Sequence, residues 1–138
     1  MSSSVITLIG RILLSVIFIL SGFGKLVDPG TAENAMSTAG MIASKGLPAS
    51  VFLAYVVGLV ELLGGLAVLA GFFTSAAAWV LALFCIASGL MFHVGATGDP
   101  TMDAINPAML MKNLAMAGGL LVLAVAGPGS ISVDARRD

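Results

Sequence analysis

Apolar residues along the chain gather into four long stretches, and the segments outside them hold the prolines and most of the charged residues. A bilayer core about 30 Å thick needs about 20 helical residues, at a rise of about 1.5 Å each. Each stretch approaches or exceeds that length, so we predict four membrane-spanning helices at about residues 5–27, 49–70, 75–92 and 108–126. The pattern indicates an all-α fold, an integral membrane four-helix bundle that forms a single domain over residues 1–138.

The longest connection, residues 28–48, is polar by the standards of this chain. A short interfacial helix is expected there at about residues 30–39. Asp28 would cap it, Pro29 suits its first position and Gly40 suits its end.

The other connections are interpreted from their breaker residues. Residues 71–74 leave room only for a tight hairpin, whereas residues 93–107 contain two glycines and two prolines and are predicted as a loop. The polar tail from residue 127 is expected to be frayed. The first stretch has no basic residue in front of it and no clear cleavage pattern behind it, so it is interpreted as a retained helix.

Composition places the chain in lipid. It is 59% hydrophobic and 9% charged, whereas an ordinary soluble domain is about 45–50% apolar and about 25% charged. A net charge of −1 leaves no basic patch for phosphates, so the expected partner is the lipid bilayer and not nucleic acid. The one cysteine, Cys85, lies in an apolar stretch and is interpreted as a buried, unreactive thiol.

The orientation in the membrane is not decided by counting charges. Four spans put both termini on one side. The basic residues divide evenly between the two sides, with Arg11, Arg136 and Arg137 on the side of the termini and Lys25, Lys45 and Lys112 opposite. The positive-inside rule is therefore balanced by count, and the paired arginines of the tail lean towards cytoplasmic termini.

Ionisable side chains within the apolar spans are the main functional candidates. They cost several kcal/mol unless they are paired or hydrated, so they are expected to face the bundle interior. The chain has few of them: Arg11, Lys25, Glu61, His93 and Lys112, with Asn113 beside the last. Gly58 and Gly65 share the helical face of Glu61, as close helix packing in lipid requires.

Depth along the spans predicts a buried ion pair between Arg11 and Glu61. Arg11 lies near the start of the first span, and Glu61 falls near the middle of the second. At about 1.5 Å per residue the two differ by about 7 Å in depth, which two long side chains can bridge. A lone carboxylate at midplane is costly, so Glu61 is expected to approach Arg11 or Lys112.

A second polar group is expected at the end of the bundle away from the termini. In an up-and-down bundle Lys25 closes the first span and His93 closes the third. Lys112 and Asn113 open the fourth span at the same end. We predict that these four residues line one polar pocket, since facing lipid would leave them without partners. Simpler roles stay open: Lys25 can extend to the headgroups, His93 can cap a helix and Asn113 can bond across helices.

Methionines near His93 raise the question of a metal. Thioether and imidazole ligands together suit Cu(I), yet methionine is also an ordinary filler of apolar cores. The side chains concerned flank His93 in sequence: Met91, Met102, Met109 and Met111. We predict no metal site, and no zinc-ligand spacing, phosphate loop or Ser/His/Asp set is present in the sequence.

Three segments carry a family resemblance: GRILLSVIFILSGFGKLVDP at 10–29, VELLGGLAVLAG at 60–71 after an earlier GLPAS, and MKNLAMAGG at 111–119. Together they resemble the DoxX family of small bacterial membrane proteins. His93 is similar to a histidine common near the end of the third helix in that family. The residues that stand where the family pattern has them are Arg11, Gly22, Lys25, Glu61, Gly65, Lys112 and Asn113.

The resemblance implies a four-helix bundle in the bacterial inner membrane, with cytoplasmic termini. It also implies a redox setting, because the namesakes of the family are membrane subunits of a thiosulfate:quinone oxidoreductase. Other members are linked to oxidative-stress systems, with a thiol-modifying enzyme and a superoxide dismutase as partners. The present sequence has a single cysteine and so no redox cysteine pair of its own.

Three functions stay open at this point. In the first, the chain is a membrane subunit or anchor of a redox assembly, joined to a protein partner or a second copy. Lys112, His93 and Asn113 would then hydrogen-bond a quinone, with Glu61 as proton partner and catalysis in another chain. In the second, Arg11, Glu61 and Lys112 line the path of a small-solute transporter or permease. In the third, the chain is a structural assembly factor without chemistry of its own.

Overall fold

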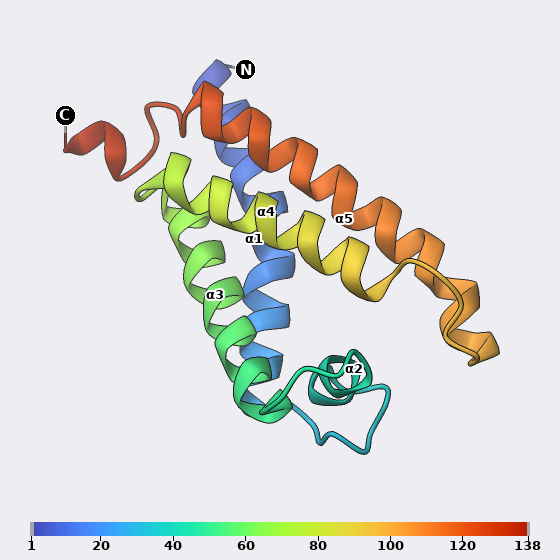
Figure 1. Cartoon of the computed structure of the whole chain (residues 1–138). Helices are drawn as coiled ribbons and strands as arrows, with labels where there is room; N and C mark the ends of the chain where they lie inside the picture. The colour runs from blue at the N-terminus through green and yellow to red at the C-terminus, as the bar shows by residue number, and fades with distance from the viewer. Residues whose placement is uncertain (1, 138) are drawn as a thin grey trace.

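All regular secondary structure over residues 2–137, the part of the chain that this computed structural model describes, is helical. Four of the helices are long and apolar enough to cross a membrane. In chain order the elements are α1 (Ser3–Val27), α2 (Thr38–Ser44), α3 (Ser50–Ala70), α4 (Thr74–Phe92), α5 (Pro100–Ala126) and the 3-10 turn η1 (Asp134–Arg136) (Figure 1). The prediction of an all-α membrane fold with four spans is confirmed.

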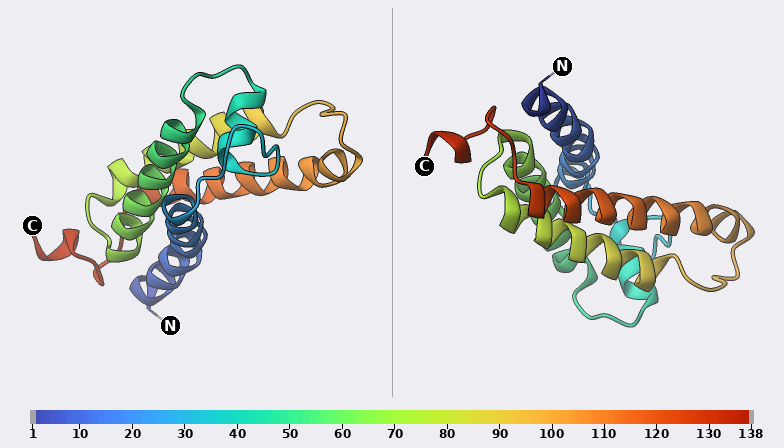
Figure 2. Two further views of the ribbon diagram at one scale, coloured as in Figure 1. Left: turned by 90° about the horizontal axis from the view of Figure 1, so that it is seen from below. Right: turned by 90° about the horizontal axis from the view of Figure 1, so that it is seen from above.

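The four spans form two pairs. α1 packs along α3, and α4 packs along α5, while the core that joins the pairs comes from the halves of the helices nearest the termini. Figures 1 and 2 show the pairs diverging away from that closed end, with α2 lying between their open ends. Both termini lie at the closed end, as an even number of spans requires.

Glycines allow α1 and α3 to approach until their backbones touch. A side chain at Gly22 would lie only 2.5 Å from the backbone nitrogen of Leu62 and 2.6 Å from the carbonyl oxygen of Gly58. Close approach of this kind is how helices associate in lipid, where apolar burial between helices supplies no driving force. The pair is therefore fixed in register at the level of Gly22 and Gly58.

The core lies between the two helix pairs near the closed end. Phe18, Leu81 and Leu120 come from three different helices and are almost completely buried. By contrast, the outward faces carry large apolar side chains such as Leu13 and Val125, which are 73% and 84% exposed. A water-soluble protein of this size rarely exposes so continuous an apolar surface, so these faces are the ones that meet lipid.

The short helix α2 lies later than the predicted residues 30–39. Ser37 is its cap, since the Ser37 hydroxyl accepts a hydrogen bond from the backbone of Gly40 at 3.0 Å. Asp28, the predicted cap, instead accepts from the backbone N–H of Gly30 at 2.9 Å and closes a turn before the helix. Gly40 consequently lies inside α2 and does not end it.

The helix α5 begins at Pro100, about two turns before the predicted start at 108, so much of the predicted loop is helical. The Asp99 carboxylate caps it by accepting from two backbone N–H groups, at 2.8 and 3.1 Å, and Pro100 occupies the first helical position. Pro107 lies within the helix, where it cannot donate to the carbonyl of Asp103. A strong cap thus overrides one missing hydrogen bond, which membrane helices tolerate.

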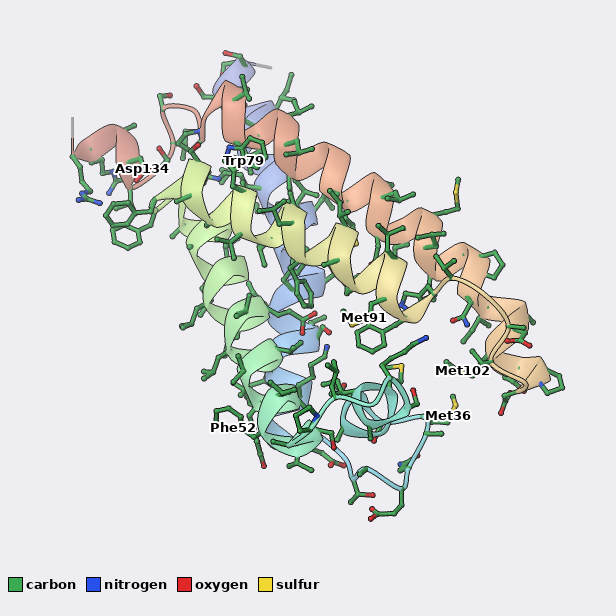
Figure 3. The ribbon with its side chains drawn as sticks, in the orientation of Figure 1. Met36, Phe52, Trp79, Met91, Met102 and Asp134 are labelled. Atoms are coloured by element: carbon green, nitrogen blue, oxygen red, sulfur yellow. The ribbon has the colours of Figure 1, made fainter. Side chains whose placement is uncertain are left out.

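The polar tail folds back onto the closed end and is not frayed. Asp134 accepts hydrogen bonds from the backbone of Phe73 at 2.8 Å and from the backbone and hydroxyl of Thr74 at 2.9 and 2.8 Å (Figure 3). Phe73 precedes α4 in a left-handed conformation and has no capping side chain of its own, so the tail supplies the cap. The Arg137 guanidinium lies 4.6 Å from the centre of the Phe73 ring.

This cap generates a pH-dependent prediction. The pKa of Asp134 is lowered chiefly by the Thr74 backbone N–H that donates to it, with further help from the Phe73 N–H and the charge of Arg137. The carboxylate therefore stabilises the fold above its unfolded pKa of about 3.9. That stabilisation is lost as the pH falls through the lower pKa of the folded protein.

We expect Asp134→Ala to lower the unfolding free energy by about 1 kcal/mol at neutral pH, the usual effect of a lost cap. Thermal unfolding in detergent measures this loss. The difference in unfolding free energy between variant and wild type should become smaller below about pH 4. Glu33→Gln removes the same charge at an exposed position and should change nothing. A difference in unfolding free energy that stays the same in acid would contradict this role for the Asp134 carboxylate.

Candidate functional site

A cavity of about 450 Å³ lies between the two helix pairs on the open side of the core. All five helices contribute to its wall, and α2 supplies Thr38, Met41 and Ile42. Most of the lining is apolar and includes Phe84 and Met116 from deep within the spans. Its polar members are Ser21, Lys25, Thr38, Glu61, Ser88, His93, Lys112 and Asn113.

Glu61 forms its ion pair with Lys25, so the predicted pairing with Arg11 or Lys112 is wrong. The Lys25 ammonium lies 2.7 Å from the Glu61 carboxylate, and both side chains are largely buried. Ser21, one turn before Lys25, receives a hydrogen bond from the ammonium and donates to Glu61 at 3.2 Å. Long side chains of a helix point back towards its N-terminus, so Lys25 is directed into the membrane instead of out to the headgroups.

Arg11 bonds to carbonyl oxygens through its two terminal nitrogens, while its buried Nε has no hydrogen-bond partner among the described residues. Its guanidinium donates to the carbonyl of Leu69 at 3.1 Å and to that of Pro128 at 2.9 Å, and the residue is 2% exposed. The Leu69 carbonyl lies in the last turn of α3, where the helix dipole places partial negative charge, and the Pro128 carbonyl lies just beyond the end of α5. Two helix ends therefore replace the carboxylate that the sequence argument assigned to Arg11.

His93 ends α4 and contacts a residue that the sequence analysis missed. Its Nδ1 lies 3.0 Å from the carboxamide oxygen of Asn106, which is 2% exposed. Asn106 fell within the predicted loop, so no role was considered for it. The Asp99–Pro100 cap could have revealed it, because a helix starting there puts Asn106 and Asn113 two turns apart on one face.

Lys112 and Asn113 both reach the cavity wall. The Asn113 amide donates to the Ser88 hydroxyl at 3.4 Å, across α5 and α4. The Lys112 ammonium lies 3.6 Å from the sulfur of Met109, a weak acceptor, and forms no salt bridge within residues 2–137. Lys112 thus brings a positive charge that the described part of the chain leaves uncompensated.

The structure brings Lys25, His93, Lys112 and Asn113 to the wall of one cavity, whereas Arg11 lies away from it at the closed end. The arrangement offers donors and one imidazole at one end of a mostly apolar space, which suits an amphipathic molecule. That a ligand binds there stays a prediction.

The four methionines that flank His93 in sequence do not all reach the cavity. Met91 and Met109 line it, while Met102 and Met111 do not (Figure 3 shows Met91 and Met102). Within residues 2–137 no three His, Cys, Asp or Glu side chains lie close enough to hold an ion. Cys85 is buried on the cavity wall and forms no disulfide.

Fold and cavity together define a small helical membrane protein with four spans and an amphipathic cavity between its helix pairs. The sequence profile of the DoxX family matches residues 6–94, and the chain belongs to that family. The matched segment contains Arg11, Lys25, Glu61 and His93 and ends before α5.

Two relatives from Escherichia coli (strain K12) match most of the chain. Inner membrane protein YqjF is 35% identical over 127 residues, which cover 92% of this chain and 88% of that protein. Inner membrane protein YphA is 33% identical over 135 residues, covering 96% of this chain and 90% of that protein. No solved structure matches the chain at a significant level.

The Lys25–Glu61 pair is testable by a double-mutant cycle. Removing one partner of a buried pair typically costs about 3–5 kcal/mol, because the other charge is left uncompensated. Lys25→Met and Glu61→Gln should each lower the melting temperature in detergent. The double variant should be more stable than the sum of the two losses predicts.

The matched cycle uses Arg11→Met with Glu61→Gln. Because Arg11 bonds to carbonyls and not to Glu61, these two losses should add. Coupling between Arg11 and Glu61, with none between Lys25 and Glu61, would reverse the assignment of the pair.

Proposed function

We propose that this protein is the membrane subunit or anchor of a redox assembly, quinone-linked or acting in oxidative stress, and that its cavity binds a quinone head. The observation that carries the proposal is the cavity itself. Its volume of about 450 Å³ lies in the range of small-molecule sites, and it joins an apolar wall to a cluster of polar groups. A quinone combines the same two characters, an apolar ring and tail with polar oxygens at the ring.

Lys112 and Asn113 are the donors suited to a quinone oxygen. The Lys112 ammonium has no acidic partner in the described chain and lines the cavity, so a ligand oxygen would give it one. Asn113 has its amide bound to Ser88 only at 3.4 Å, which leaves donor capacity free. His93, at the same end, supplies a group that can accept or donate a proton.

Glu61 serves this site as a proton partner through the ion pair. Its carboxylate lies beside Lys25 and Ser21 on the cavity wall, so a proton reaching Glu61 would leave Lys25 uncompensated. Electron transfer itself is assigned to another chain, because the cavity offers no redox group beyond a single thiol.

The proposed setting is the bacterial inner membrane, with cytoplasmic termini. The names of YqjF and YphA place those relatives in the inner membrane, and the paired Arg136 and Arg137 favour a cytoplasmic tail. A protein partner or a second copy of the chain completes the assembly. A transporter fits less well, because the packed core closes the space between the helix pairs on the side of the termini.

Quinone content is the direct test. We expect protein purified from membranes in mild detergent to retain quinone, detected by solvent extraction and chromatography. Lys112→Met keeps the length of the side chain and removes its charge, so it should weaken binding of added decylubiquinone about tenfold or more. Lys45→Met, an exposed lysine outside the cavity, is the control.

Equal quinone binding by wild type and Lys112→Met, with both proteins folded, would return Lys112 to a structural role. Absence of quinone from the wild type, both as purified and after addition, would remove the proposal. Proteins that co-purify with the wild type identify the rest of the assembly.

A further inference from the structure

We infer that Asn106 is a positioning residue that holds His93 in one tautomer, so that the cavity recognises a ligand hydroxyl. The neutral imidazole would carry its hydrogen on Nδ1 and present Nε2 as an acceptor. Resting on the proposed function, this names the reduced quinol as the preferred form of the ligand. Neither the sequence pattern nor the relatives assign a role to Asn106.

The hydrogen bond between the two residues carries the argument. The carboxamide oxygen of Asn106 lies 3.0 Å from Nδ1 of His93. An amide oxygen can only accept, so the ring nitrogen facing it must bear the hydrogen. A neutral imidazole has a single N–H, which leaves Nε2 with a lone pair. Nε2 has no partner within residues 2–137, and His93 lines the cavity.

The helix that carries Asn106 is anchored independently of His93. One turn earlier on α5, Asp103 accepts hydrogen bonds from the backbone and hydroxyl of Thr97, at 2.6 and 2.7 Å. The loop between α4 and α5 is thereby tied to the helix that carries Asn106. His93 at the end of α4 and Asn106 on α5 are consequently kept at a fixed separation.

The position of Asn106 has a free-energy cost, which falls on the nitrogen of its side-chain amide. The Asn106 nitrogen is buried and has no hydrogen-bond partner in the described chain. An apolar residue of similar size would avoid that penalty, so packing alone does not explain an asparagine here. A role in orienting the His93 ring explains the asparagine, because its amide oxygen accepts the hydrogen bond from Nδ1.

An acceptor at Nε2 changes which ligand fits the cavity. Quinone oxygens are acceptors only, so they satisfy Lys112 and Asn113 but leave Nε2 unpaired. A hydroquinone carries hydroxyl groups, each of which both donates and accepts. One hydroxyl can donate to Nε2 while the other oxygen accepts from Lys112. The cavity is therefore matched to the hydroxyl form.

The tautomer can be measured without any ligand. His93 is the one histidine in the chain, so labelling with 15N-histidine gives a spectrum from a single ring. At about pH 8.5, where an ordinary imidazole is neutral, we expect hydrogen on Nδ1 and none on Nε2. Hydrogen found mainly on Nε2 in the wild type would overturn the inference, and this measurement requires no variant.

Variants then show whether Asn106 sets the tautomer. Asn106→Leu removes the acceptor and should release the ring, so that the Nε2–H form appears. Asn106→Asp keeps an oxygen at the same place and should retain the Nδ1–H form. Asn113→Leu changes the same residue type two turns later without contact to His93 and is the control. An unchanged spectrum in Asn106→Leu would overturn the positioning role.

Ligand preference is measured separately with decylubiquinol, kept reduced under nitrogen, and decylubiquinone. Wild type should bind the quinol more tightly, and Asn106→Leu should lose that preference, by about three- to tenfold. Equal binding of both forms to a wild type with Nδ1–H would overturn the hydroxyl preference alone. Binding of neither form removes the proposed function and the preference with it, while the tautomer assignment is still decided by the spectrum.

Discussion

A polar group inside a bilayer has no water to turn to, and this constraint organises every buried charge in the chain. Lys25 and Glu61 satisfy it with each other, and Arg11 satisfies it with carbonyls at two helix ends. Lys112 differs from these three residues, because its side chain is exposed and its ammonium contacts only a thioether, the sulfur of Met109. Two buried nitrogens, Nε of Arg11 and the amide nitrogen of Asn106, have no hydrogen-bond partner among the described residues. The unpaired groups that a cavity ligand could meet are the Lys112 ammonium and Nε2 of His93.

The membrane spans and the polar residues predicted to line the cavity could be read from the sequence, because both depend only on how deep each residue lies in the bilayer. The length of an apolar run fixes where a helix enters and leaves the bilayer, and therefore how deep each residue lies. Lys25, His93 and Lys112 each stand near the same edge of a span, and any antiparallel arrangement brings them together. No knowledge of side-chain direction was needed for that conclusion.

Which residues at a similar depth pair with one another could not be predicted. The pairing depends on the rotation of each helix about its axis and on contacts between residues distant in sequence. Lys25 reaches Glu61 because Gly22 and Gly58 bring the two backbones together and the side chain points back along the helix. Asn106 was hidden by Pro107, a helix breaker by rule, whose effect here is overcome by the cap before it. The Lys25–Glu61 pair was decided by tertiary context, whereas the start of α5 was decided by a local cap, which outweighed the proline.

The bond from Arg11 to Pro128 also has a consequence for biosynthesis. The two residues are 117 positions apart, so α1 leaves the ribosome long before the carbonyl that completes its arginine exists. Until then the guanidinium has Leu69 alone, and earlier still only lipid phosphates or water at the membrane surface. The hydrogen bonds of Arg11 are therefore complete only once the chain as far as Pro128 has been made, so the final contacts of α1 depend on the segment that follows α5.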